Sequence, residues 1–191
     1  LAAGRGPAGG REQCAPPRAT ADATDVLARV AFGSGSNVLV EEPGYQALRY
    51  ALHGLGVGTV PVPVDADGMD LLRAPRVPHV RGAVVTPSRH FPLGATLPLA
   101  RRLALLDWAA AVGGLVVEDD FDSEYRYEGT PLPALMSLDR HGRAIYVGSF
   151  SKVLSSSLRL GFLVVPDKLV GPAREHLRRR GLAASLIAQP A

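Results

Sequence analysis

The sequence alternates between short runs of β-branched and other apolar residues and longer amphipathic stretches. This alternation is typical of an α/β sheet, in which helices connect strands that pair with one another. Several of the apolar runs are continuous, as expected for strands that are buried on both faces. The pattern predicts six strands, at residues 37–41, 59–64, 83–86, 115–118, 145–149 and 162–165.

Four amphipathic stretches between these runs predict helices, at residues 24–32, 45–55, 98–112 and 168–180. The apolar residues that recur at helical spacing in the third stretch are Leu99, Leu103, Leu106 and Ala110. With 191 residues, the chain is long enough to form one core. We therefore expect one α/β domain.

Residues 1–18 differ from the rest, because Gly, Ala, Pro and Arg dominate them without an apolar period. Such a composition buries too little surface to offset the entropy lost on ordering. We expect a disordered or non-native segment at 1–18, followed by the domain at 19–191. The chain opens on Leu1 and stops at Ala191 without an obvious closing element, so we also expect a fragment of a longer polypeptide.

Charge, cysteine content and hydropathy exclude several classes of protein. The net charge is +3 and spread along the chain, so charge alone gives no reason to predict nucleic-acid binding. The single cysteine, Cys14, excludes an intrachain disulfide and fits a reducing compartment. No apolar run approaches the roughly 20 residues that cross a bilayer, and no signal peptide opens the chain. We expect a cytoplasmic protein without a membrane partner.

Three consecutive acids, Glu118, Asp119 and Asp120, follow the apolar run 115–117. In open α/β sheets, ligands bind beyond the carboxyl ends of the strands, which makes polar residues at these ends candidate site residues. Clustered carboxyl groups raise one another's pKa, so they stand at a strand end when a cation binds there or when they face water. The acids alone leave both alternatives open and favour a solvated loop.

A lysine follows the strand 145–149: the residues 148–152 read GSFSK, and Arg159 lies seven positions after Lys152. Taken alone, such a lysine is typical of a solvated surface. Here two hydroxyl groups, on Ser149 and Ser151, and a guanidinium accompany it, and such groups bind phosphate through charge-assisted hydrogen bonds. An amine, a carboxylate for a pyridinium nitrogen and a phosphate cradle are together what pyridoxal phosphate requires. The combination predicts a site for this cofactor and no metal site.

The stretch from about Thr24 to Arg180 resembles the aminotransferase-like domain of the MocR family of GntR-type bacterial transcription regulators. This domain belongs to the fold-type I pyridoxal phosphate proteins, the superfamily of class I/II aminotransferases. The matching strings are VEEPGY (40–45), TPS (86–88), VEDDFDSEYRY (117–127), YVGSFSK (146–152) and LRLG (158–161). The resemblance implies an incomplete large domain of this fold, a three-layer α/β/α structure with a mostly parallel sheet, without its C-terminal lobe and without a winged helix.

The resemblance implies roles for the residues already singled out. Lys152 matches the lysine that forms an internal aldimine with pyridoxal phosphate, and Asp119 matches the carboxylate that pairs with the pyridine nitrogen. Ser149, Ser151 and Arg159 match phosphate-binding positions.

Tyr45 matches an aromatic residue near the cofactor ring, where it would stack; the alternative is a helix-start residue packed on the sheet. Other positions depart from the family. Phe121 replaces a tyrosine whose hydroxyl contacts the cofactor's phenolic oxygen, and ATAD at 19–22 replaces a Gly-Ala-Gln-like turn whose amides meet the phosphate. The pair Arg89-His90 replaces His-Gln, and a loop histidine without an identified partner predicts no catalytic role.

Three functions stay open. In the first, which we favour, the chain is the effector-sensing domain of a regulator that binds a small-molecule amine or amino acid. It dimerises at full length and contacts DNA only through a domain outside this chain. In the second, Lys152 acts as the general base of a transamination while Asp119 keeps the pyridinium charged. In the third, the chain is a degenerate fragment that binds nothing.

Overall fold

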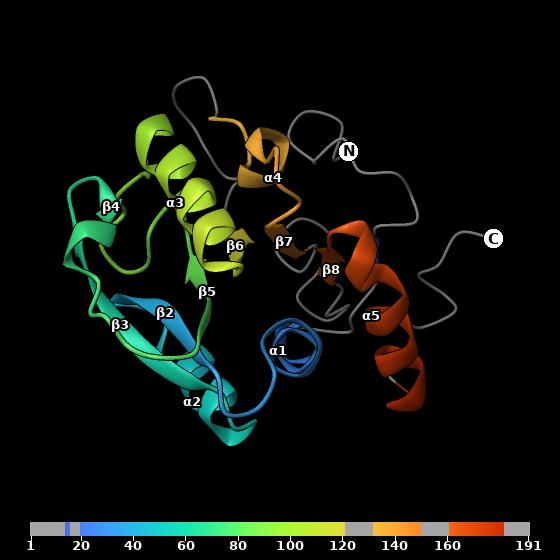
Figure 1. Cartoon of the computed structure of the whole chain (residues 1–191). Coiled ribbons are helices and arrows are strands. Elements are labelled where there is room, and N and C mark those ends of the chain that lie inside the picture. Colours follow the sequence, from blue (N-terminus) through green and yellow to red (C-terminus); the bar gives the residue numbers. More distant parts are fainter. Residues whose placement is uncertain (1–13, 16–19, 121–131, 150–160, 182–191) are drawn as a thin grey trace.

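The structure is a computed structural model that describes residues 14–15, 20–120, 132–149 and 161–181. These residues contain an eight-stranded sheet with the strand order β1-β8-β7-β6-β5-β2-β3-β4. The strands are β1 (Cys14–Ala15), β2 (Asn37–Glu42), β3 (Gly58–Asp65), β4 (Gly68–Met69), β5 (Val80–Val85), β6 (Leu115–Asp120), β7 (Ala144–Ser149) and β8 (Gly161–Val164). Helices cover both faces of the sheet and give a three-layer α/β/α fold (Figure 1).

The sheet is mostly parallel, as predicted. β3, β2, β5, β6 and β7 run in one direction, whereas β1, β4 and β8 pair in the antiparallel sense. The six predicted strands are confirmed as β2, β3, β5, β6, β7 and β8, with shifted ends. β1 and β4, of two residues each, are too short to produce a sequence pattern. β1 uses Cys14 and Ala15 of the segment 1–18, whose other residues lie outside the described part of the chain.

The helices of the described residues are α1 (Thr20–Val26), the π-helix η2 (Leu27–Phe32), α2 (Gln46–Gly54), the 3-10 turn η3 (Leu71–Arg73), α3 (Leu99–Val112), α4 (Leu135–Leu138) and α5 (Asp167–Arg179). All four predicted helices are present. The first begins earlier than predicted, at Thr20, and continues beyond Val26 with π-helical pairing. Within the described ranges, no helix is both long and apolar enough to cross a membrane.

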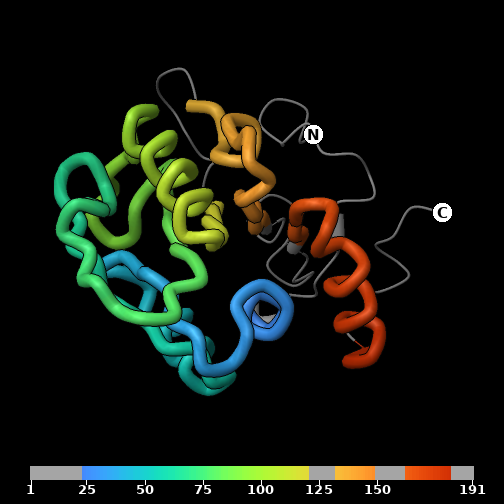
Figure 2. Tube along the Cα trace, viewed as in Figure 1, coloured from blue at the N-terminus to red at the C-terminus, as the bar shows by residue number. Residues whose placement is uncertain are grey.

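Successive residues of the central strands pack against opposite layers of helices. Val38 and Val40 of β2 belong to the core beneath α1, α2 and α5, and Leu39 belongs to the core beneath α3 and α4. Burial on both faces explains why the strands read as continuous apolar runs. In Figure 2 the first helix, in blue, lies beside the last, in red, and the His176 ring of α5 is 2.6 Å from Asp25 of α1.

The structure corrects the helical spacing expected in α3. Leu99 and Leu103 are 44% and 42% exposed. The buried residues of this helix are instead Arg102, Leu105, Leu106 and Ala109. The spacing of apolar residues missed this face because one of its members carries a charge.

The guanidinium of Arg102 is fully buried and holds three separate segments together. It donates hydrogen bonds to the main-chain oxygens of Pro87 at 2.8 Å, Leu97 at 2.8 Å and Pro133 at 2.9 Å. Its Nη1 also lies 3.9 Å from the buried carboxylate of Glu118 on β6. Arg102 therefore fixes the loop between β5 and α3 and the segment before α4 against the end of the sheet.

We expect Arg102→Met to lower the free energy of unfolding by about 3–5 kcal/mol, because it removes the cation beside the buried carboxylate of Glu118 and a hydrogen-bond donor of three main-chain oxygens. The control is Arg178→Met, which removes an exposed ion pair with Glu175 on the surface of α5 and should cost at most about 1 kcal/mol. Urea unfolding of both variants measures the difference. Equal, small losses would contradict the role given to Arg102.

Candidate functional site

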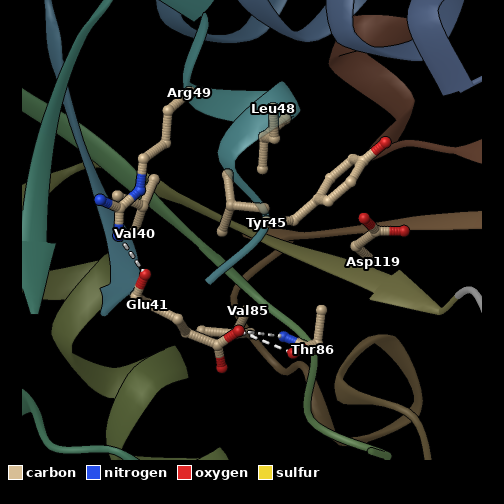
Figure 3. Close-up of a pocket in the computed structure, with 9 residues that line it drawn as sticks. Val40, Glu41, Tyr45, Leu48, Arg49, Val85, Thr86 and Asp119 are labelled. Carbon is tan, nitrogen blue, oxygen red and sulfur yellow. Dashed lines mark hydrogen bonds between the residues drawn. The ribbon is translucent and has the colours of Figure 1, made fainter. Parts of the chain in front are cut away.

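The carboxyl ends of β2, β5 and β6 border an open pocket (Figure 3). Its polar lining consists of Glu41, Tyr45, Arg49, Thr86 and Asp119. The pocket therefore lies where an open α/β sheet binds its ligands, at the end to which the strands point.

The three consecutive acids of β6 separate onto two faces of the sheet. Asp119 lines the pocket, whereas Glu118 and Asp120, on either side of it, are 1% and 8% exposed on the opposite face. There Glu118 accepts a hydrogen bond from the Leu135 amide at 2.7 Å, and Asp120 accepts one from the hydroxyl of Tyr146. The prediction of a solvated loop from the three acids alone is wrong, because β6 pairs with β7 as far as Asp120.

Burial changes the acidity of these groups. Burial and the neighbouring charge of Asp120 raise the pKa of Asp119 to about 6. Burial also raises the pKa of Glu118 to about 7, although the Leu135 amide and Arg102 act to lower it. Within the described part of the chain, Asp119 has no hydrogen-bond donor or cation as a partner. A carboxyl group of this kind is stabilised by a positively charged ligand.

Glu41, at the end of β2, is a second carboxyl group in the pocket and is 7% exposed. Its Oε2 accepts hydrogen bonds from the Thr86 amide at 3.1 Å and from the Thr86 hydroxyl at 2.7 Å (Figure 3). Burial raises the pKa of Glu41 to about 7 against these hydrogen bonds, and the charge of Asp119 raises it further. The sequence prediction did not include Glu41, and the signal for it was its position at a strand end within the string VEEPGY.

His90 is buried, at 2% exposure, whereas the sequence indicated a loop histidine without a partner. Its Nδ1 accepts a hydrogen bond from the Leu93 amide at 3.3 Å, and its Nε2 lies 3.7 Å from Glu41 Oε2. Burial lowers the pKa of His90. His90 therefore contributes a neutral ring behind Glu41.

Tyr45 is the N-cap residue of α2, and its side chain is 51% exposed. Its ring lies beside Asp119 at the pocket (Figure 3) and meets the ring of Phe91 edge-on, with centroids 6.3 Å apart. Tyr45 does stand at the start of a helix, as the alternative expects, but about half of its surface is exposed. Its stacking on a cofactor stays a prediction.

The structure brings two of the six predicted site residues, Asp119 and Tyr45, to one pocket. The main chain of Ser149 ends β7, the neighbour of β6, and so reaches the same edge of the sheet three residues before Lys152. Lys152, Ser151 and Arg159 lie outside the described residues, as does Phe121.

The raised pKa of Glu41 implies a pH-dependent stability. Because the folded-state pKa of about 7 lies above the usual 4.5, ionisation of Glu41 opposes folding as pH rises from 4.5 through 7. The cost of ionising Glu41 in the folded state is absent below both pKa values and complete above pH 7. Between pH 5 and pH 8, we expect the free energy of unfolding of the parent to fall by about 2–3 kcal/mol more than that of Glu41→Gln. Urea unfolding at both pH values measures this, with Asp107→Asn at an exposed position of α3 as control, and parallel profiles of parent and Glu41→Gln would refute it.

The chain is similar to bacterial regulators over long stretches. It is 41% identical over 191 residues, all of this chain and 38% of the relative, to a protein named as the probable rhizopine catabolism regulatory protein MocR of Rhizobium meliloti. It is 45% identical over 129 residues, 66% of this chain and 27% of the relative, to the HTH-type pyridoxine biosynthesis transcriptional regulator PdxR of Corynebacterium glutamicum. The chain thus spans well under half the length of these relatives.

Its fold is similar to that of solved aminotransferases. Over 91% of this chain and 46% of the other, it matches LysN, an alpha-aminoadipate aminotransferase from Thermus thermophilus, with a TM-score of 0.80 and 31% identity. That structure was solved as a complex with N-(5'-phosphopyridoxyl)-L-leucine. The family model described as aminotransferase class I and II matches residues 11–191. The chain therefore belongs to the aminotransferase class I and II family and has the fold-type I architecture of its large domain.

Proposed function

We propose that the chain is the pyridoxal phosphate-binding, effector-sensing domain of a MocR-type transcription regulator. The observation that carries this proposal is the similarity to the MocR protein of Rhizobium meliloti along all 191 residues, at 41% identity. The aminotransferase LysN, by comparison, is 31% identical. In this proposal, a domain outside this chain contacts DNA. The full-length regulator acts in the cytoplasm as a homodimer.

The pocket supports pyridoxal phosphate as the cofactor. Asp119 offers a carboxyl group without a partner among the described residues, and a protonated ring nitrogen supplies the charge that stabilises it. Tyr45 presents an exposed ring beside this carboxyl group, where an aromatic ligand stacks. When bound, the cofactor supplies a carbonyl group and an electron sink.

The remaining predicted residues complete this site in the proposal. We assign covalent attachment of the cofactor to Lys152, and phosphate binding to Ser149, Ser151 and Arg159. This assignment is supported by the position of Ser149, the last residue of β7, which pairs with the strand β6 that carries Asp119. A small-molecule amine or amino acid would displace the Lys152 amine and leave it free, and its binding would shift the population of the dimer.

The second candidate function is an aminotransferase, which the similarity to LysN favours. In that case Lys152 takes the α-proton of an amino acid, and Asp119 holds the proton on the ring nitrogen. Because both functions share these residues, turnover separates them. With an α-keto acid present as amino acceptor, conversion of many equivalents of an amino donor by the chain supports the enzyme, and stoichiometric binding without conversion supports the sensor.

Covalent trapping tests the assignment of Lys152. The chain has two lysines, Lys152 and Lys168, so labelling has few possible targets. After incubation with pyridoxal phosphate, borohydride reduction and proteolysis, we expect the modified peptide to contain Lys152. Lys152→Ala should lose the label, and the matched variant Lys168→Ala, altered at an exposed position of α5, should keep it.

A label on Lys168 or on the N-terminal amine alone would refute the assignment. The absence of any label from the parent chain would support a degenerate fragment and overturn both cofactor hypotheses.

For Asp119→Ala we expect cofactor affinity to fall by about tenfold to a hundredfold, because a charge-assisted hydrogen bond contributes about 1.5–3 kcal/mol. Asp107→Ala, which removes an exposed acid of α3 far along the helix from this pocket, is the control. Absorbance titration with pyridoxal phosphate measures both affinities. Unchanged retention by Asp119→Ala would exclude its pairing with the ring nitrogen.

A further inference from the structure

Two carboxyl groups from different strands face the same pocket. Glu41 comes from the end of β2 and Asp119 from the end of β6, with β5 between the two strands. Their charges interact, since the charge of Asp119 contributes to the raised pKa of Glu41. The resemblance to the family accounts for Asp119 and leaves Glu41 without a role.

Arg49, the cationic side chain of the pocket lining, does not neutralise the carboxyl group of Glu41. Arg49 donates one hydrogen bond to the carboxylate of Glu42 and another to the main-chain oxygen of Glu41. The side-chain carboxyl of Glu41 instead accepts hydrogen bonds from the neutral donors of Thr86. Arg49 therefore fixes the β2 end and leaves the acidic side chain uncompensated.

His90 is not a counter-ion either. Its Nε2 lies 3.7 Å from Glu41 Oε2, beyond hydrogen-bond distance, and its Nδ1 is occupied by the Leu93 amide. Burial lowers the pKa of this ring and so disfavours its charged form. The groups that face the Glu41 carboxyl from the described elements are thus Thr86, a neutral His90 and Asp119.

A carboxyl group in this position opposes folding when it ionises, because it is buried beside a second acid without a cation. A glutamine would accept the same hydrogen bonds from Thr86 without this cost. Residues that are unfavourable for stability in a pocket are typical of binding sites, where a ligand supplies the missing interaction. A positive charge in the pocket is the interaction that Glu41 and Asp119 both lack.

We propose that Glu41 is a second acidic residue of the cofactor site, whose charge stabilises the pyridinium that Asp119 binds. The inference rests on the proposed function and extends it by a residue on another strand. Glu41 acts through its charge, and Asp119 remains the hydrogen-bond partner of the ring nitrogen. The two acids together favour a cationic ring over a neutral ring of the same shape.

Affinity for pyridoxal phosphate tests the charge of Glu41. At pH 8, we expect Glu41→Gln in the 191-residue chain to bind about tenfold more weakly than the parent, the change that corresponds to one pKa unit of interaction. At pH 6 the difference should shrink, because protonation removes the same charge from the parent. Asp107→Asn removes an exposed charge of α3 away from the pocket lining and should bind within about twofold of the parent at both pH values.

A second measurement examines the two acids in the ligand-free chain. Carbon-13 NMR titration follows each carboxyl group, and we expect Asp119→Asn to lower the pKa of Glu41. The control Asp107→Asn changes an exposed acid of α3 and should leave the pKa of Glu41 unchanged. An unchanged pKa of Glu41 in Asp119→Asn would show that the charges do not interact and would overturn the inference.

The outcomes separate the inference from the proposed function. If the parent binds pyridoxal phosphate and Glu41→Gln binds it equally well at pH 8, the inference fails alone. If the parent binds none, the proposed function fails and the inference with it. A loss of affinity in Asp107→Asn as large as that in Glu41→Gln would assign the effect to the general charge of the surface and would also overturn the inference.

Discussion

The parallel pairing of β2, β5, β6 and β7 is the constraint on which the rest of the structure depends. Because these strands run in one direction, their carboxyl ends meet at one edge of the sheet. Glu41, Thr86 and Asp119 stand at three of these ends although they are up to 78 positions apart in the sequence. Arg102 completes the edge, since its buried guanidinium binds the loops that follow β5 and precede α4.

At this edge, the acids on the two faces of the sheet differ in their partners. On the face of α3 and α4, Glu118 lies near the buried guanidinium of Arg102, and Asp120 is hydrogen-bonded to Tyr146. On the pocket face, Glu41 and Asp119 have no cation among the described residues. The acids of the α3 and α4 face thus have partners within the protein, although burial still raises the pKa of Glu118 to about 7. The acids of the pocket face have no cationic partner among the described residues, and in our proposal a positively charged ligand supplies one.

Much of this arrangement follows from the sequence. Continuous apolar runs located the six longer strands, and the acids after the run 115–117 drew attention to Asp119. The face that each acid occupies was not predictable from the run itself, because it depends on how far the pairing of β6 with β7 extends. Arg102 escaped prediction for a related reason, since a helical period of apolar residues does not include a charged side chain buried by three carbonyl oxygens. The burial of His90 was not predictable either, since its ring lies beside Glu41, which is 49 positions earlier in the chain.

The central claim is that the acidic edge of the sheet binds pyridoxal phosphate through its ring nitrogen. A crystal structure of the chain grown with pyridoxal phosphate tests it most directly. The account predicts density continuous with the side chain of Lys152, with the ring nitrogen at hydrogen-bond distance from Asp119 and the ring plane against Tyr45. A cofactor bound at another surface, or a ring whose nitrogen faces away from Asp119, would contradict it.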